Sequence, residues 1–122
     1  MHRVLIVDDE EDFLSLLSLA FEGEFRRMDV MSAASSEGAF QGISQFAPDL
    51  VITDLVMPGT GGIALIEKIK KVAPKMPIVA MSGYDDEIDL LQEKRPEIDL
   101  LVKPFDLDEL ARIVRSIFQM PH

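Results

Sequence analysis

The sequence predicts an α/β fold, (βα)5, in which a doubly wound five-stranded parallel sheet is flanked by helices. Short apolar runs alternate along the chain with longer amphipathic ones, which is the pattern of repeated strand and helix units. Most of the short runs are apolar at nearly every position, as in parallel strands that are buried on both faces. The 122 residues suit one domain with one sizeable core, so we expect a single domain over residues 1–122.

The expected strands are the five short apolar runs, at residues 3–7, 28–32, 50–53, 77–81 and 99–102. The second run, MDVMS, is the least apolar and is expected to lie at an edge of the sheet. The near-continuous apolar character of the other four predicts strands that are buried on both faces.

Apolar residues at helical spacing predict the helices between the strands. The expected core stripes are Phe13, Leu16, Leu17, Ala20 and Phe21, then Phe40, Ile43 and Phe46, then Leu65, Ile66 and Ile69. In the last helix Asp106 and Glu109 have the spacing of a capping box. One apolar face of that helix is expected from Leu107, Leu110, Val114 and Ile117. The helix near residues 85–94 has few apolar anchors and is expected to be the most weakly held.

The composition excludes several classes of partner. Twelve basic residues against 22 acidic ones give a formal net charge of −10, which repels nucleic-acid backbones and anionic membranes. No apolar run approaches the roughly 18 residues that span a bilayer, and the first apolar run is too short for a secretory signal. The chain has no cysteine, so disulfides and thiolate chemistry are absent. We therefore expect no direct nucleic-acid or membrane partner and a cytoplasmic location.

Polar residues follow four of the five expected strands. They are Asp8 and Asp9 after the first strand, Asp54 after the third, Ser82 after the fourth and Lys103 after the fifth. In a doubly wound sheet, ligands bind outside the carboxyl ends of the strands. We therefore expect these five side chains to meet on one rim.

Three carboxylates on one rim require a compensating cation. Two unit charges about 4 Å apart interact by roughly 4 kcal/mol at an effective dielectric constant near 20. Oxygen ligands without a nearby histidine or cysteine favour Mg²⁺, so Asp8 and Asp9 are candidate metal ligands. Asp54 is the best candidate nucleophile, since aspartate forms covalent phosphoryl intermediates. Ser82 and Lys103 would hold phosphoryl oxygens by charge-assisted hydrogen bonds.

Four stretches of the chain, VLIVDDEEDF, DLVITDLVMPGTGG, IVAMSG and LVKPFDLDEL, together resemble a known family. Over essentially its whole length the sequence is similar to the response-regulator receiver domains of two-component and phosphorelay signalling, the CheY-like family with a flavodoxin-like sheet. The resemblance implies that Asp54 accepts a phosphoryl group from a phosphohistidine on a histidine kinase or a histidine phosphotransfer protein. It implies that Mg²⁺ is bound by Asp8, Asp9, Asp54 and the backbone carbonyl of Val56.

The resemblance also implies that Ser82 and Lys103 contact the phosphoryl group and that the Lys103–Pro104 bond is cis. Phosphorylation is then expected to shift the surface of residues 82–119 and so control a partner or an output domain. The face of residues 84–119 is a candidate homodimer surface. Such a chain is an interaction module, and its only catalysis concerns its own phosphorylation and dephosphorylation.

The sequence departs from the family pattern at three positions. The family usually carries a Tyr or Phe three residues before the lysine, which turns inward on phosphorylation, and here this residue is Leu100. Two positions that tend to set phosphate lifetime, two residues beyond Asp54 and beyond Ser82, are Val56 and Tyr84. Neither side chain readily holds an attacking water, so a long-lived phosphoaspartate is expected.

Two other classes of function fit parts of the pattern. A Mg²⁺-dependent aspartyl-phosphate hydrolase commonly needs a second acid two residues after its nucleophile, where this chain has Val56. A flavodoxin-like binding module that works without phosphorylation needs a first loop that cradles a phosphate. Here that loop is DDEED, which would repel one.

Overall fold

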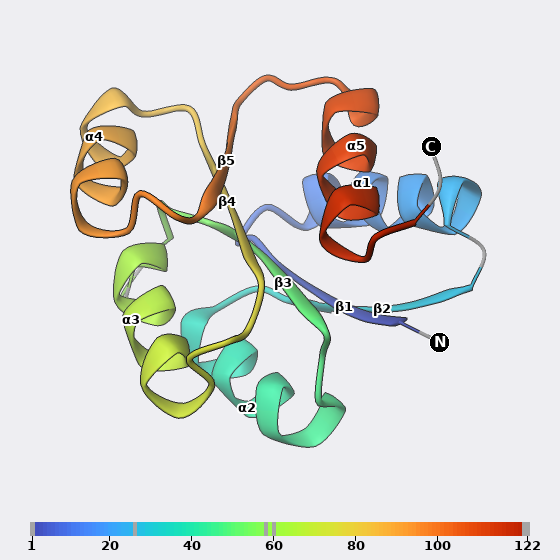
Figure 1. Ribbon diagram of the computed structural model, residues 1–122, viewed down its shortest axis with the longest axis horizontal. Coiled ribbons are helices and arrows are strands. Elements are labelled where there is room, and N and C mark those ends of the chain that lie inside the picture. Colours follow the sequence, from blue (N-terminus) through green and yellow to red (C-terminus); the bar gives the residue numbers. More distant parts are fainter. Residues whose placement is uncertain (1, 26, 58, 60, 121–122) are drawn as a thin grey trace.

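One parallel sheet with strand order β2-β1-β3-β4-β5 forms the centre of the computed structural model, which describes residues 2–25, 27–57, 59 and 61–120 (Figure 1). The strands are β1 (His2–Val7), β2 (Met28–Ala33), β3 (Leu50–Asp54), β4 (Ile78–Ser82) and β5 (Asp99–Val102). The helices are α1 (Glu11–Glu24), α2 (Ser36–Phe46), α3 (Gly62–Val72), α4 (Asp85–Lys94) and α5 (Leu107–Ile117). Every pair of neighbouring strands is parallel, so the predicted (βα)5 fold is confirmed.

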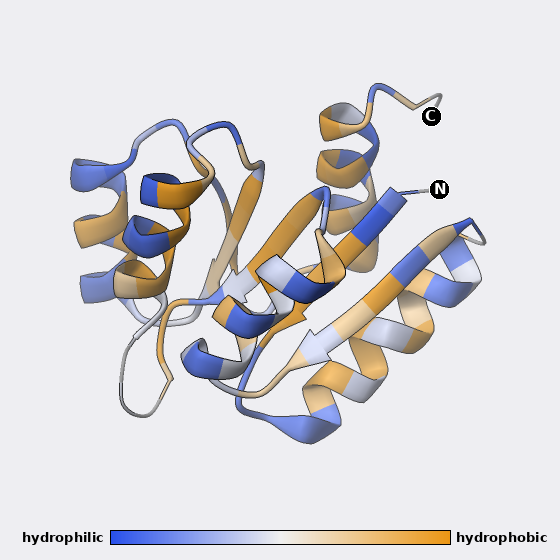
Figure 2. Ribbon diagram, turned by 90° about the horizontal axis from the view of Figure 1, so that it is seen from below, coloured by the Kyte–Doolittle hydropathy of each residue, from blue (hydrophilic) through white to orange (hydrophobic). Residues whose placement is uncertain are grey.

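The helices cover both faces of the sheet. Figure 1 shows α1 and α5 on one face and α2, α3 and α4 on the other. Each face has its own apolar cluster, one under α1 and α5 and one under the other three helices. All residues of β3 and β4 are buried, and the apolar colour of Figure 2 is concentrated on these central strands. Burial on both faces is why these strands read as continuous apolar runs.

The two ends of the sheet differ from the prediction in one respect. β2 lies at an edge, as its weak apolar character predicts. β5 is the other edge strand, and only Leu101 of its four residues is buried, while Val102 is 51% exposed. The prediction that this strand is buried on both faces is therefore wrong. An apolar run can therefore also occur in an edge strand whose side chains are only partly covered.

In α1 and α5 the buried face differs in part from the apolar face that the sequence predicts. In α1 the buried residues are Leu14, Leu17 and Phe21, whereas Leu16 is 68% exposed. Leu16 is two residues beyond Leu14 and therefore lies about 200° further round the helix. In α5 Leu107 is 54% exposed, although Leu110 and Val114 are buried as predicted.

The other helices follow the sequence more closely. Leu65, Ile66 and Ile69 of α3 are buried as predicted. In α2 the fully buried positions are the small residues Ser36, Ala39 and Gly42, and the larger predicted residues (Phe40, Ile43 and Phe46) are half-buried beside them. Small residues on this face let the helix lie close to the strand below.

The capping prediction for α5 is wrong in detail. Asp106 is the N-cap residue, but its side chain makes no capping hydrogen bond. The helix expected over residues 85–94 is present, with Leu91 as its buried residue.

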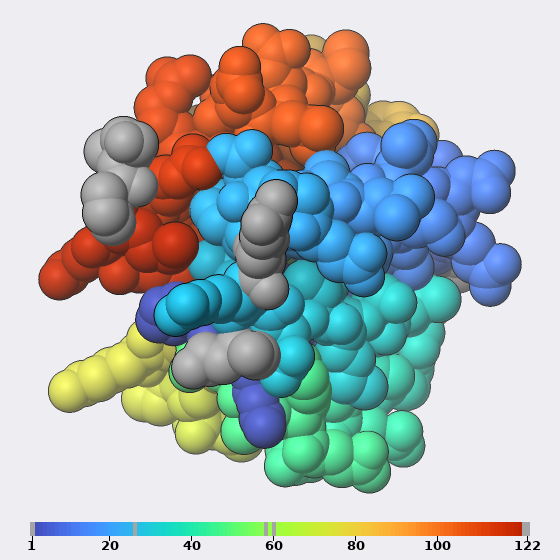
Figure 3. All heavy atoms as spheres, turned by 90° about the vertical axis from the view of Figure 1, so that its right-hand side faces the viewer, coloured from blue at the N-terminus to red at the C-terminus, as the bar shows by residue number. Residues whose placement is uncertain are grey.

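The first and last helices meet next to the chain termini. Figure 3 views this side of the molecule, where α1 and β2, in blue to cyan, lie beside the red C-terminal helix. Arg115 of α5 forms an ion pair with Glu24 of α1, and the ring of His2 stacks on that of Phe118 with centroids 4.0 Å apart. Among the helices that the structure describes, none is long and apolar enough to cross a membrane.

Candidate functional site

The carboxyl edge of the sheet brings the predicted site residues together. Asp8 directly follows β1, Asp54 ends β3, and Lys103 directly follows β5. Because β1, β3, β4 and β5 are adjacent and parallel, the ends of these strands meet at one edge. One carboxylate oxygen from each of Asp8, Asp9 and Asp54 lies within 4.8 Å of the other two. The sequence prediction of a three-carboxylate cluster is thus matched by the geometry.

Backbone hydrogen bonds fix the two buried carboxylates. The amide of Glu10 donates to Asp8 Oδ1 at 3.0 Å, and the amide of Val56 donates to Asp54 Oδ1 at 3.3 Å. The hydroxyl of Thr53, which is fully buried, donates to the carbonyl oxygen of Asp54 at 2.9 Å. Asp8 and Asp54 are therefore held by the turns that follow their strands.

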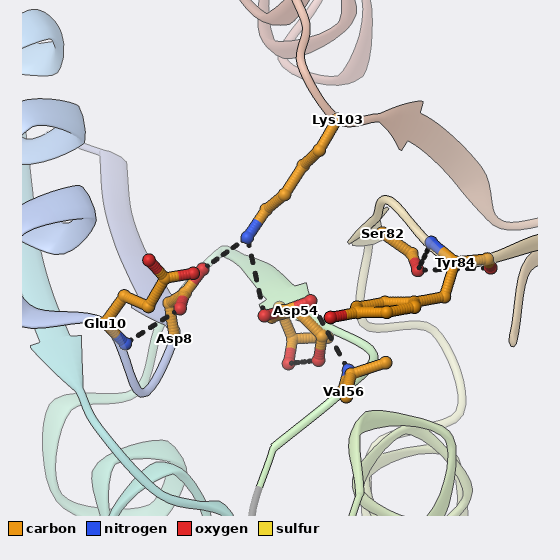
Figure 4. Close-up of polar contacts among 8 residues, drawn as sticks. Asp8, Glu10, Asp54, Val56, Ser82, Tyr84 and Lys103 are labelled. Atoms are coloured by element: carbon orange, nitrogen blue, oxygen red, sulfur yellow. Dashed lines mark hydrogen bonds and ion pairs between the residues drawn. The ribbon is translucent and has the colours of Figure 1, made fainter.

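Lys103 supplies the cation of this cluster. Its Nζ lies 2.9 Å from Asp8 Oδ2 and 3.4 Å from Asp54 Oδ2, and Figure 4 shows the ammonium pointing down between the two carboxylates. The Lys103 side chain is 21% exposed, against 0% for Asp8 and 9% for Asp54. Solvent screens such a partly enclosed pair less than it screens a surface pair. One lysine therefore partly neutralises two buried acids.

The acid–base properties of the cluster reflect this crowding. Burial raises the pKa of Asp54 above its ordinary value of 3.8, and the charge of Asp8 raises it further, although Lys103 and the Val56 amide oppose the change. Burial lowers the pKa of Lys103, but the hydrogen bond that its ammonium donates to Asp8 and the charges of both acids outweigh this effect, so that the pKa is raised. Lys103 is therefore charged, and Asp54 is a carboxylate whose charge is poorly compensated.

A pocket of about 510 Å³ opens above Asp54. Its walls include Asp9, Val56, Gly83, Tyr84 and Lys103. Figure 4 shows the ring of Tyr84 extending from the loop after β4 towards Asp54 and Val56. Tyr84 is 63% exposed and Val56 is 38% exposed, so the two side chains form an accessible rim. The pocket is roomy enough for a phosphoryl group beside a hydrated ion.

Ser82 ends β4 at the same edge of the sheet, and its hydroxyl contacts the loop that follows this strand. It is fully buried, and its hydroxyl oxygen accepts a hydrogen bond from the amide of Tyr84 at 3.0 Å. The structure thus brings Asp8, Asp9, Asp54 and Lys103 together, whereas the Ser82 hydroxyl faces the loop after β4. The same hydroxyl donates only a long hydrogen bond, at 3.5 Å to the carbonyl oxygen of Tyr84, so its hydrogen can be redirected to a stronger acceptor.

The loop after β3 packs against the site through a glycine. A Cβ added at Gly62, the first residue of α3, would collide with the carbonyl group of Asp54 and with the backbone of Leu55. The amide of Gly62 also donates to the carbonyl of Leu55 at 2.9 Å. The turn that carries Asp54 therefore requires glycine here, which the sequence reasoning missed. Pro58 in this loop lies outside the described residues.

Two features of the fifth strand bear on the family pattern. The Lys103–Pro104 peptide bond is cis, as the resemblance implies. Leu100 is half-buried and packs against the apolar cluster beneath α2, α3 and α4. A leucine thus fills the position where the family usually carries an inward-turning aromatic ring.

Sequence reasoning also missed an aromatic neighbour of the lysine. The Lys103 Nζ lies 4.3 Å from the centroid of the Phe13 ring, which had been assigned only to the core stripe of α1. A signal was present, because Phe13 follows the acidic run and Phe105 follows Lys103 at the same rim.

The donor set of the cluster fits a hard divalent cation. Within the described part of the chain, its potential ligands are carboxylate oxygens of three aspartates. Mg²⁺ prefers oxygen ligands and keeps several of its waters, for which the pocket has room. An α/β sheet whose carboxyl edge holds an acidic cluster, a lysine and an open pocket defines a domain suited to metal-assisted phosphoryl chemistry.

Comparison with known proteins identifies the family. The model of the response regulator receiver domain family matches residues 4–115. The chain is 32% identical over 117 residues to sporulation initiation phosphotransferase F of Bacillus subtilis, covering 93% of this chain and 91% of that protein. It is 31% identical over 121 residues to regulatory protein AtoC of Escherichia coli, covering 98% of this chain but 26% of AtoC. The chain belongs to the response regulator receiver domain family.

The solved structures agree with the fold. A response regulator receiver domain protein from Clostridium thermocellum superposes with a TM-score of 0.87 at 24% identity, covering 98% of this chain and 95% of that one. The chain is thus a receiver domain of two-component response regulators and not a classical enzyme.

Proposed function

We propose that Asp54 is the phosphoacceptor of this receiver domain and that it takes its phosphoryl group from a phosphohistidine. The observation that carries the proposal is the position of Asp54 between Lys103 and the two other aspartates, facing an open pocket. An Asp54 carboxylate oxygen attacks phosphorus, the bond from phosphorus to the histidine nitrogen breaks, and the departing imidazole takes up a proton. The donor is a histidine kinase or a histidine phosphotransfer protein.

The metal in this proposal is Mg²⁺, held by Asp8, Asp9, Asp54 and the backbone carbonyl of Val56. When bound, Mg²⁺ neutralises charge on the transferring phosphoryl group. The three carboxylates would hold the ion, and the amide hydrogen bonds to Asp8 and Asp54 fix the positions of these two side chains. The charge balance supports this assignment, since one lysine faces three acids whose oxygens lie within 4.8 Å of one another.

Lys103 and Ser82 are proposed to hold the phosphoryl oxygens. Lys103 can exchange its hydrogen bond to a carboxylate for one to a phosphoryl oxygen, because both are anionic acceptors within reach of the same pocket. Ser82 would donate its hydroxyl hydrogen to a phosphoryl oxygen, and because the same hydroxyl oxygen accepts the amide of Tyr84, a shift of Ser82 towards that group would move the loop that leads into α4. The covalent change at Asp54 would in this way be passed to residues 82–119.

The surface of residues 84–119 is proposed as the output face. It carries exposed apolar side chains at Tyr84, Leu90, Val102 and Leu107, between 40% and 63% exposed, which suits a partner, an output domain or a second copy of the chain. The only catalysis proposed for the domain is that of its own phosphorylation and dephosphorylation. A cytoplasmic location stays a prediction.

The proposal is tested by intact-mass analysis. The protein is incubated with acetyl phosphate, with and without Mg²⁺, beside Asp54→Asn and beside Asp29→Asn, which removes an exposed aspartate of β2 as a matched charge control. We expect one phosphoryl adduct on the wild type and on Asp29→Asn that requires Mg²⁺, and none on Asp54→Asn. An adduct that survives in Asp54→Asn would assign the acceptor to another residue.

A further inference from the structure

Lys103 has a third neighbour besides its two carboxylates. The face of the Phe13 ring lies 4.3 Å from Nζ, well inside the roughly 6 Å over which a cation–π interaction acts. Phe13 lies in the first turn of α1, directly beyond the acidic run. The ammonium group of Lys103 is therefore in contact with a residue of α1 as well as with the two carboxylates.

The ring of Phe105 packs against the ring of Phe13. Phe105 meets Phe13 edge to face, with centroids 6.2 Å apart and an interplanar angle of 89°. Both rings are half-buried and pack against the apolar cluster under α1 and α5. Such a T-shaped pair has a preferred geometry, so the orientation of the Phe13 ring is fixed by the core and by Phe105.

The chemistry of the ammonium explains what a ring provides here. An ammonium group has three N–H donors, and those of Lys103 are shared between Asp8 at 2.9 Å, Asp54 at 3.4 Å and the negative face of the ring. The ring attracts the cation without offering an anionic oxygen. A carboxylate at position 13 would instead compete with the phosphoryl group for the lysine.

We propose that Phe13 is a positioning residue for Lys103, holding its ammonium in the pocket while its hydrogen-bond partner changes from a carboxylate to a phosphoryl oxygen. This inference rests on the proposed phosphoacceptor function of Asp54. A ring face tolerates small lateral shifts of the cation, because the attraction does not depend on one donor direction. Phe13 therefore confines Lys103 without fixing it to one partner.

The first test reads the contact itself, in the unphosphorylated protein. Protons on the ε-carbon of Lys103 lie near the ring face, so their NMR signals should be shifted upfield in the wild type relative to the unfolded chain. Phe13→Leu should abolish that shift, Phe13→Tyr should keep it, and Phe46→Leu should leave it unchanged. Phe46 is a matched control, because its ring lies over Arg3, at the far end of β1. An unshifted Lys103 signal in the wild type would overturn the proposal without any variant.

The second test reads the function, as the rate of phosphorylation by acetyl phosphate at saturating Mg²⁺. Loss of a cation–π contact should slow Phe13→Leu by about 2- to 30-fold, mainly in the maximal rate, with Phe13→Tyr and Phe46→Leu near wild type. Thermal melts establish that each variant is folded. If Phe13→Leu does not fold, Phe105→Leu, which leaves the ring unsupported, takes its place with a smaller expected loss.

A folded Phe13→Leu or Phe105→Leu variant that is phosphorylated at the wild-type rate would overturn the positioning role. A wild type that shows the upfield shift but accepts no phosphoryl group would overturn the proposed function, and the positioning role with it.

Discussion

Replacing Asp54 with asparagine is expected to stabilise the folded protein at neutral pH when no divalent metal is present. The wild type holds two buried carboxylates, Asp8 and Asp54, beside the exposed Asp9 and one lysine. Asparagine keeps the shape of the side chain and an oxygen that can accept the Val56 amide, but it carries no charge. The substitution therefore relieves the charge crowding and leaves the Lys103–Asp8 pair in place.

The size of the effect follows from the distances. Two unit charges 4.8 Å apart repel each other by about 3.5 kcal/mol at an effective dielectric constant near 20, which sets the scale of the repulsion between Asp8 and Asp54. At 3.4 Å the attraction between Lys103 and Asp54 is about 5 kcal/mol on the same basis. Burying the charge of Asp54 costs several kcal/mol more. The neutral variant should therefore be more stable by about 1–2 kcal/mol.

The raised pKa of Asp54 makes the stability difference depend on pH. The pKa of Asp54 is raised above 3.8 by burial, so the folded state binds this proton more tightly than the unfolded chain does. The contribution of Asp54 to stability is therefore fully present below about pH 3.8 and is lost as the pH rises through its raised pKa. The advantage of Asp54→Asn over the wild type should be small in acid and should open across that window.

The assay is urea unfolding in EDTA from pH 3.5 to pH 7, with Asp29→Asn as the control for net charge. A saturating metal adds about 2.7 kcal/mol at a hundredfold excess over its Kd, so Mg²⁺ should narrow or reverse the difference by stabilising the wild type more. If Asp54→Asn is less stable than the wild type in EDTA, or has the same stability as the wild type at every pH, then the charge of Asp54 does not destabilise the fold.

Four further substitutions test other parts of the structure. Gly62→Ala should destabilise the fold by about 1–3 kcal/mol or more, because its Cβ would collide with the carbonyl of Asp54; unchanged urea unfolding would contradict this. Val56→Ala and Tyr84→Ala should each shorten the half-life of the phosphorylated protein, since both residues line the rim of the pocket, and unchanged or longer half-lives would remove the shielding role. Ser35→Ala should cost about 1 kcal/mol of stability, because the Ser35 hydroxyl accepts the Gly38 amide at 3.0 Å at the start of α2, and a loss below about 0.3 kcal/mol would show that this cap is unimportant.

The strands were predictable because a strand that is buried on both faces is apolar at nearly every position. β3 and β4 are buried at every position, and their apolar runs match the observed strands to within one residue. The order of the strands in the sheet is less evident from the sequence. β5 is as apolar as the central strands yet lies at an edge, because apolar residues also serve one-sided burial and exposed surface.

The helix faces were predictable in period but not in rotation. Leu16 and Leu107 fit the helical spacing of their neighbours, yet both face solvent. The spacing allows more than one apolar stripe, and the sheet beneath selects one of them. Leu14, Leu17 and Phe21 form the stripe that α1 uses.

The composition of the site was predictable because parallel strands end at the same edge. Asp8, Asp54 and Lys103 come together as expected. Side-chain directions were not predictable, since they depend on the loops. The hydroxyl oxygen of Ser82 accepts a hydrogen bond from the amide of Tyr84. The ring of Phe13 lies beside Lys103, although the position of Phe13 in the helical pattern suits the core.

Locating the phosphoryl group tests the central claim most directly. Borohydride reduces an acyl phosphate to an alcohol, so reduction of the phosphorylated protein, digestion and tandem mass spectrometry mark the acceptor as homoserine. We expect homoserine in place of Asp54, and only after treatment with acetyl phosphate and Mg²⁺. Homoserine in place of Asp8 or Asp9, or a phosphoryl group that survives reduction on Ser82, would contradict it.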